Sequence, residues 1–235
     1  MPTQLSELRG DVLVHCPKAS EILVDGMLAD AARTFYRESK IKRVALAAIN
    51  MVAAQAEYAL PNPAGFQIAD VRWATCRGSP LNPVSEEELD MQWAERRAGL
   101  TYTAYHSHQY QGLTNTDWRA ATSDQPYSYY CPEPNVARLV GVPLASVTGA
   151  LLFNVSIYPI DPTEVDDWVF NEWQDAIVAK ALESLFLMPA KPWTSGNLAT
   201  FYADSYEGLK TEAHARANRG NRRNDRPLRT TSYAR

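Results

Sequence analysis

Apolar residues recur at helical spacing near both ends of the chain. Within residues 17–38 they lie on one stripe of a helix, at Val24, Met27, Leu28, Ala31 and Phe35. The same period returns over residues 163–187, where Thr163 is positioned to cap the helix, and a further helix is expected from Ser195 to a stop at Gly220. Because the link between these two helices is short, we expect them to form an antiparallel hairpin.

The middle of the chain, residues 41–160, has a different pattern. Short runs rich in aromatic and β-branched residues predict strands within residues 66–81, where residues 78–80 make a turn, and at residues 101–110, 126–130, 137–144 and 150–160. In the first run the alternation changes phase between Ile68 and Val71, which indicates a β-bulge. One short helix is expected over residues 85–97, with acids in its first turn and arginines in its last.

Together these elements predict an α+β fold: an antiparallel helical bundle with an inserted β-rich region and an extended C-terminal tail. The first helix is too short to bury its apolar stripe alone, so it packs most simply on the C-terminal hairpin. The predicted boundaries are residues 1–40 and 162–220 for the helical bundle, residues 41–161 for the inserted β-rich region, and residues 221–235 for an extended basic arm.

Composition changes this picture mainly through the distribution of charge. The chain has 235 residues, of which 46% are hydrophobic and 21% charged, enough for a core of ordinary size. Residues 214–235 contain seven arginines and one acid, a formal +6, and because the whole chain carries −4, residues 1–213 carry −10. An acidic body argues against a general nucleic-acid coat, which needs a basic face. The tail alone can still contact nucleic acid or an acidic protein groove.

The cysteines and the apolar runs limit the cellular setting. Cys16, Cys76 and Cys131 are odd in number and widely spaced, which signals neither a zinc site nor a disulfide framework. The N-terminal residues include acids and no long apolar run, and no stretch reaches the apolar length of a membrane span. We therefore expect an intracellular protein in a reducing compartment, without a membrane partner.

The pair His106 and His108 is the first candidate for chemistry. Residues two positions apart on a strand point to the same face, so both imidazoles can reach one metal ion. The sequence indicates no third ligand. The simpler interpretation is that the two histidines are polar residues of a strand, beside tyrosines, and bind no metal. The chain also lacks a G-x-S-x-G elbow and the glycine pattern and lysine of a phosphate loop. We expect no catalytic residue, no metal and no cofactor; a metal-dependent enzyme centred on this pair is the less favoured alternative.

The basic arm, residues 221–235, contains few apolar side chains and cannot build a core. Its arginines are separated by Asn, Asp, Pro, Leu and Thr, which is less typical of a phosphate-neutralising segment than one dense block. Arginine forms bidentate bonds with carboxylates and stacks on aromatic rings, so the arm suits docking on a protein surface. The alternatives are a DNA-binding protein that uses this tail on phosphates, and a solvated tail without a role.

Four longer stretches carry a resemblance to a known family: CPKASEILVDGMLADAARTFYRES, AEYALPNPAGFQIADVRW, TDWRAATSDQPYSYY and LLFNVSIYPIDPTEVDDWVFNEWQDAIVAKALESLFLMPAKPW. In this order, and followed by an arginine-bearing end, they resemble the head-to-tail adaptor (connector or neck) proteins of tailed bacteriophages, of the tail tubular protein A type. The likeness covers most of the chain and is weakest over residues 82–116.

The resemblance implies a structural virion protein and not an enzyme. Adaptors of this kind look like a helical bundle with a β-rich insertion, and they assemble as rings, usually of twelve copies, beneath the portal vertex. Such a ring extends the DNA channel and provides a platform for the tail. The implied partners are the portal protein, a tail or nozzle protein and further copies of the chain, while DNA passes through without sequence-specific binding. The implied location is the virion neck, after synthesis in the host cytoplasm.

The resemblance also gives the arginine-rich tail a partner, because a C-terminal extension of related adaptors reaches the portal. Carried onto this chain, it implies portal contacts at Arg222, Arg223, Arg226, Leu228, Arg229 and Tyr233. The acidic body fits a channel wall as well, since a basic lining would hold DNA phosphates.

Overall fold

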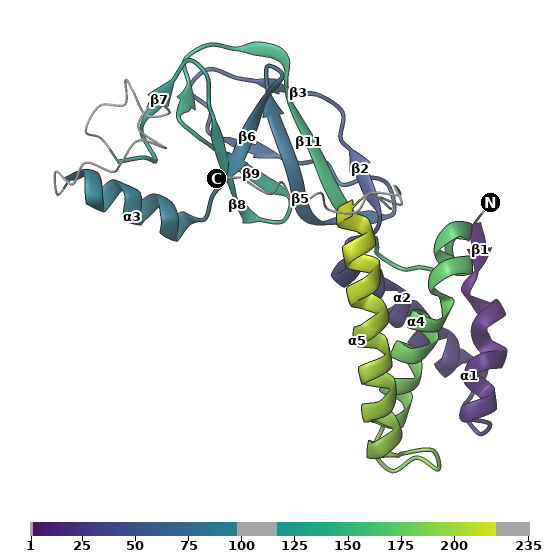
Figure 1. Ribbon diagram of the computed structural model, residues 1–235. Coiled ribbons are helices and arrows are strands. Elements are labelled where there is room, and N and C mark those ends of the chain that lie inside the picture. Colours follow the sequence, from purple (N-terminus) through teal and green to yellow (C-terminus); the bar gives the residue numbers. More distant parts are fainter. Residues whose placement is uncertain (1, 98–116, 220–235) are drawn as a thin grey trace, which may run out of the picture.

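The computed structural model describes residues 2–97 and 117–219. Its longer helices gather in one part of the molecule and most of its strands in another, with one short helix at the far end of these strands (Figure 1). The predicted mixed α+β class is confirmed. Among the described residues, no helix combines the length and the apolar character needed to cross a membrane.

Helices from the two ends of the chain share one hydrophobic core. Leu28 and Phe35 from the N-terminal side are fully buried in it, as are Ile177 and Leu185 from the C-terminal side. Burial of such side chains is the main favourable contribution to folding. The elements around this core are η1 (Leu5–Leu8), α1 (Arg9–His15), α2 (Glu21–Ser39), α4 (Asp167–Phe186) and α5 (Gly196–Arg219).

Helix α2 presents the predicted apolar stripe to this core, with Val24, Leu28, Ala31 and Phe35 buried. The helix begins later than the expected start at residue 17, because Ser20 caps it. The Ser20 hydroxyl oxygen accepts a hydrogen bond from the Leu23 amide at 3.4 Å. The helix ends at Ser39, since Lys40 adopts the left-handed conformation with φ of 53°.

A short strand pair precedes α4 and corrects the prediction for its start. Strand β12 (Glu164–Asp166) pairs antiparallel with β1 (Pro2–Gln4), and the Thr163 carbonyl accepts a hydrogen bond from the Leu5 amide at 3.0 Å. Because β12 is extended, α4 begins only after it, and the predicted cap at Thr163 is wrong. Strand β1 and helix α1 were not predicted, because both are too short to give a clear periodic signal.

Helices α4 and α5 lie side by side and run antiparallel, as the short link between them predicts (Figure 1). Phe186 at the end of α4 stacks on Tyr202 near the start of α5, with ring centroids 5.7 Å apart. At the opposite ends, Arg216 of α5 donates to Glu172 of α4 at 2.9 Å. Leu198, in the first turn of α5, is exposed. The buried positions of α5 are Ala199, Tyr206 and Ala213.

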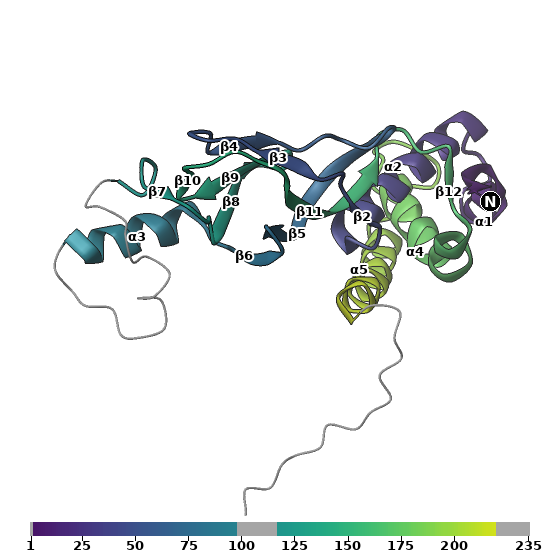
Figure 2. The ribbon, with the colours of Figure 1, turned by 90° about the horizontal axis from the view of Figure 1, so that it is seen from above.

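Eight of the strands between α2 and α4 form one curled sheet (Figures 1 and 2). Its order is β2-β11-β5-β6-β8-β9-β4, with β3 paired to β11. Only β6 and β8 pair in parallel within it. The strands are β2 (Arg43–Ala45), β3 (Ile49–Met51), β4 (Glu57–Ala59), β5 (Phe66–Cys76), β6 (Ser79–Pro83), β8 (Ser128–Glu133), β9 (Val136–Val140) and β11 (Val147–Pro159).

A separate parallel pair joins β7 (Thr122–Ser123) to β10 (Val142–Pro143). The strands expected in the second half of the β-rich region are present: residues 126–130, 137–144 and 150–160 correspond to β8, to β9 with β10, and to β11. The strand expected at residues 101–110 lies outside the described residues.

The two longest strands, β5 and β11, contain the irregularity that the phase change predicts. Their register shifts twice, and the extra residues in β5 are Ala69 and Arg72. A bulge re-aims the side chain of the extra residue, and Arg72 reaches Asn218 at the end of α5. Beyond β5, Arg77 and Gly78 have φ of 50° and 80° and form the two-residue turn into β6.

The short helix α3 (Glu86–Arg97) lies at the end of the sheet away from the other helices (Figures 1 and 2). Ser85 and Glu88 cap it reciprocally: the Ser85 hydroxyl accepts from the Glu88 amide at 3.1 Å, and the Glu88 carboxylate accepts from the Ser85 amide at 2.9 Å. A small separate core holds this end together, consisting of Leu89, Trp93, Trp118, Ala121, Tyr130 and Val140.

Candidate functional site at the end of helix α5

The structure describes the chain up to the last turn of α5, at Arg219. The residues predicted to contact a portal all lie outside the described part: Arg222, Arg223, Arg226, Leu228, Arg229 and Tyr233. His106 and His108 lie outside it as well. Within residues 2–97 and 117–219 there is no group of three His, Cys, Asp or Glu side chains suited to a metal ion. The candidate site is therefore the described surface closest to the predicted arm, at the end of α5.

The end of α5 is held against the start of the sheet. His214 Nδ1 lies 3.2 Å from the carbonyl oxygen of Ser39, the last residue of α2. One turn further on, the side-chain oxygen of Asn218 accepts hydrogen bonds from Arg43 Nη2, at 3.1 Å, and from Arg72 Nη2. Arg43 belongs to β2 and Arg72 to the bulge of β5, so this contact brings α5 and two strands together.

A surface hollow of about 370 Å³ opens beside this contact. Its walls come from the segment between α2 and β2, from the junction of β12 with α4, and from the last turns of α5. The lining residues are Ile41, Lys42, Arg43, Asp166, Trp168, Arg216 and Ala217. The Trp168 side chain is 40% exposed. Exposed indole beside arginine is typical of surfaces that bind another protein.

Asp166 holds one wall of the hollow in place. Its carboxylate accepts hydrogen bonds from Lys42 Nζ at 2.8 and 3.0 Å and from the Tyr36 hydroxyl at 3.2 Å. Burial raises the pKa of Tyr36 above its ordinary value, and the negative charge of Asp166 raises it further. Tyr36 therefore stays protonated and remains a donor at any ordinary pH. The contacts of Tyr36 and Lys42 with Asp166 thus fix the position of the hollow relative to α2 and the sheet.

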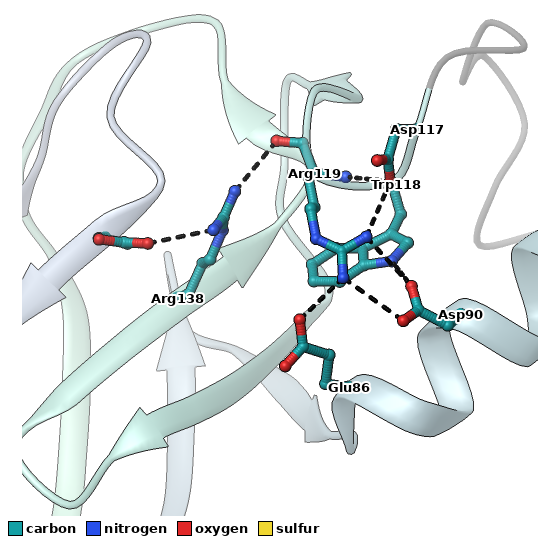
Figure 3. A network of polar contacts seen from close by, with 7 residues as sticks. Glu86, Asp90, Asp117, Trp118, Arg119 and Arg138 are labelled. Atoms are coloured by element: carbon teal, nitrogen blue, oxygen red, sulfur yellow. Dashed lines mark hydrogen bonds and ion pairs between the residues drawn. The ribbon is translucent and has the colours of Figure 1, made fainter.

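A second polar cluster lies at the other end of the sheet, around Arg119 (Figure 3). The guanidinium contacts Glu86 at 2.8 Å, Asp90 at 3.1 Å and Asp117 at 3.3 Å, and its carbon lies 4.3 Å from the centre of the Trp118 ring. The hydrogen bonds to Glu86, and after them those to Asp90, raise the pKa of Arg119. These contacts join α3 to the segment that begins at Asp117.

Trp118 is the buried centre of the cluster. Its indole Nε1 donates to Asp90 at 2.7 Å, and the Tyr130 ring meets it edge to face with centroids 5.3 Å apart. Arg138 lies 5.7 Å from the Trp118 ring and pairs with Glu57 at 3.1 Å. The charges drawn in Figure 3 are paired with one another, so this cluster fixes α3 to the sheet. The end of α5 remains the candidate binding surface.

No local sequence signal could have found the contact at the end of α5. The phase change in the first strand run located the bulge region, but it did not indicate which residue the extra arginine would meet. Arg72 and Asn218 are 146 positions apart, and Arg43 and Asn218 are 175 positions apart. Only the packing of α5 against β2 and β5 brings them together.

The described residues form a mixed α+β protein whose candidate site is a surface of arginine, indole and amide groups, a composition typical of surfaces that bind another protein. A family model described as SU10 adaptor protein matches residues 3–231 of the chain. The chain belongs to the SU10 adaptor protein family. Membership points to a phage structural adaptor without enzymatic activity, and it confirms the predicted resemblance at the level of a phage adaptor. A comparison with curated proteins gives no match.

Proposed function

We propose that the protein is a head-to-tail adaptor of a tailed phage, of the tail tubular protein A type, that forms a ring of twelve copies beneath the portal. The ring extends the DNA channel and provides the platform for a tail or nozzle protein in the virion neck. The family match over residues 3–231 carries the proposal, since it spans the helices, the sheet and most of the predicted arm. The protein is made in the host cytoplasm and acts without catalysis or a cofactor.

Within this proposal the two parts of the fold have different tasks. The helices that share the first core act as the bundle, and residues 41–161 act as the insertion that projects from it. The contacts of Tyr36, Lys42 and Asp166 support this division, because they tie α2 to the end of β12 and to the residue that precedes β2. A ring subunit needs such a fixed angle between its parts so that copies repeat around a closed symmetry.

The basic arm, residues 221–235, makes the proposed portal contact. It follows α5 directly, and the contacts of His214 and Asn218 hold the end of α5 in a defined place. Its arginines pair with carboxylates and stack on aromatic rings of the portal. Each arm contributes little alone, but repeated contacts around a ring act together and give high avidity.

The acidic charge of residues 1–213 suits a protein past which DNA moves. A formal −10 over this part of the chain repels phosphates in general and limits binding of DNA to the channel wall. DNA is therefore proposed to pass through the ring without sequence-specific contact.

Removal of residues 221–235 tests the proposal. We expect the truncated chain to keep its circular dichroism spectrum and its unfolding transition, but to be absent from particles that contain the portal. A chain in which residues 221–235 are present in scrambled order is the matched variant, since it keeps composition and charge and should also fail to join. Arg37→Gln, an exposed change in α2, is the control that should join normally.

Two results would contradict the proposal. Normal incorporation of the truncated chain excludes the arm as the portal contact. Normal incorporation of the scrambled chain, together with binding of the intact protein to bare DNA that falls steeply with salt, favours a charge-driven DNA contact instead.

A further inference from the structure

Two positive charges meet at one neutral acceptor beside the end of α5. The guanidinium groups of Arg43 and Arg72 both donate to the same side-chain oxygen of Asn218. An amide oxygen carries only a partial negative charge, so it offsets two cations poorly. Guanidinium groups that converge in this way match the two oxygens of a carboxylate better than they match one amide oxygen.

The sheet itself brings the two arginines together. Arg43 of β2 is the register partner of Ser156 on β11, and on the other side of β11 Ser156 is the partner of Asp70 on β5. Arg72 follows two residues later, as the extra residue of the bulge. A bulge in a paired strand fixes the direction of its side chain, so the convergence is built into the backbone.

The local balance of charge leaves these two arginines without an acid. Within the described part of the chain, neither Arg43 nor Arg72 forms an ion pair, and Arg43 Nε is buried without a hydrogen-bond partner. Burial lowers the pKa of Arg43, and the positive charge of Arg72 lowers it further. The neighbouring acids form ion pairs with other cations: Asp70 with Lys40 at 2.7 Å, Asp166 with Lys42 at 2.8 Å and Glu172 with Arg216 at 2.9 Å.

We propose that Arg43 and Arg72 form a carboxylate-binding site for an acidic segment of a protein partner. Trp73, which follows Arg72 in β5, is 47% exposed and supplies an apolar contact beside the charges. Arginine and tryptophan are the residues that contribute most to binding between proteins. The strongly acidic body repels an extended polyanion such as DNA, whereas one carboxylate needs only the local excess of positive charge.

This proposal goes beyond the contact of the arm, because it assigns a second contact to the described body of the protein. Its experiments use the full chain with residues 221–235 intact. Failure of these experiments therefore leaves the arm proposal standing, and failure of the arm proposal leaves this one untouched.

The first experiment measures binding of a fluorescein-labelled peptide that carries a single glutamate among neutral residues, by fluorescence anisotropy. We expect Arg43→Gln and Arg72→Gln each to weaken binding about tenfold, because each removes a hydrogen bond to a charged group. The control Arg37→Gln removes the same charge from an exposed position of α2 and should leave the affinity unchanged. Equal losses in all three variants, or no binding by the intact chain, would overturn the proposal. Tighter binding of a DNA duplex than of the peptide, lost in the same two variants, would overturn the choice of a carboxylate.

The second experiment supplies the carboxylate from within the chain through Asn218→Asp. Asn218 is in the last turn of α5, where a negative charge opposes the helix dipole and ordinarily lowers stability. If the two arginines bind the new carboxylate, the substitution stabilises the protein instead, and the melting temperature rises by a few degrees. The rise should disappear when Asn218→Asp is combined with Arg43→Gln and Arg72→Gln, and the single variant should bind the peptide more weakly. A lower melting temperature for the single variant would refute the site.

Discussion

Replacement of Trp118 by alanine should loosen the α3 end of the sheet. The side chain is 1% exposed, and it is the more deeply buried of the two tryptophans in the small core that also contains Leu89 and Tyr130. Truncation of a fully buried tryptophan costs about 3–5 kcal/mol, from lost burial and from the cavity that remains. The change also removes the donor that Asp90 accepts from at 2.7 Å. We therefore expect a loss near the upper end of that range.

The assay separates this end of the sheet from the rest of the molecule. Native-state hydrogen exchange should show faster exchange of the α3 amides in Trp118→Ala, while the amides of α4 and α5 keep their protection, because their core is a different one. Trp118→Phe keeps a ring but loses the indole donor, and should cost about 1–2 kcal/mol. Trp73→Ala is the matched control at an exposed strand position and should cost about 1 kcal/mol or less in urea unfolding. Equal losses for Trp118→Ala and Trp73→Ala, or unchanged exchange in α3, would refute the reasoning.

Further predictions concern three other positions. Gly141→Ala should lower the free energy of unfolding by about 1–3 kcal/mol, because φ is +86° and a Cβ there would lie 2.8 Å from that of Ser123; a neutral effect in urea unfolding contradicts this. Asp166→Asn should lower the free energy of unfolding by about 1.5–3 kcal/mol, because the charge that Lys42 contacts at 2.8 Å is lost. If Asp166→Asn lowers it by the same amount in a Lys42→Met background, the ion pair is not the cause. Cys131 is exposed, but desolvation of its sulfur, and after it the negative charge of Asp70, raises the pKa of the thiol to about 11. Since only the thiolate reacts, its alkylation by iodoacetamide, followed by mass spectrometry, should keep rising up to that pH and be slower at pH 8 than in the urea-unfolded chain. Equal rates in the two states at pH 8 would contradict it.

The helices were predictable where an apolar stripe was long enough to count. Val24, Leu28 and Phe35 of α2 are spaced as a helix requires, and all three are buried. The start of α4 was not predictable in the same way, because β12 pairs with a strand at the beginning of the chain. Three residues of strand give no periodic pattern, and their pairing depends on residues more than one hundred positions away.

The candidate site was less predictable than the fold. The phase change near Val71 indicated an irregular strand, which the register shifts of β5 confirm. The sequence does not indicate that Arg72 would meet Arg43 at the last turn of α5, because this contact results from packing between distant segments. The predictions for residues 222–233 and for His106 and His108 stay predictions.

The shared core of the helices has a consequence for the order of synthesis. Tyr206 in α5 donates to Glu38 in α2 across 168 positions of chain, and Trp173 in α4 lies 6.1 Å from the ring of Phe35. On a ribosome, α2 is therefore complete long before its packing surface exists, while the strands that follow it can already pair among themselves. The apolar side of α2 stays exposed to water until α4 and α5, residues 167–219, have emerged. A stalled or shortened translation product should consequently be a target for chaperones, even when its sheet is properly formed.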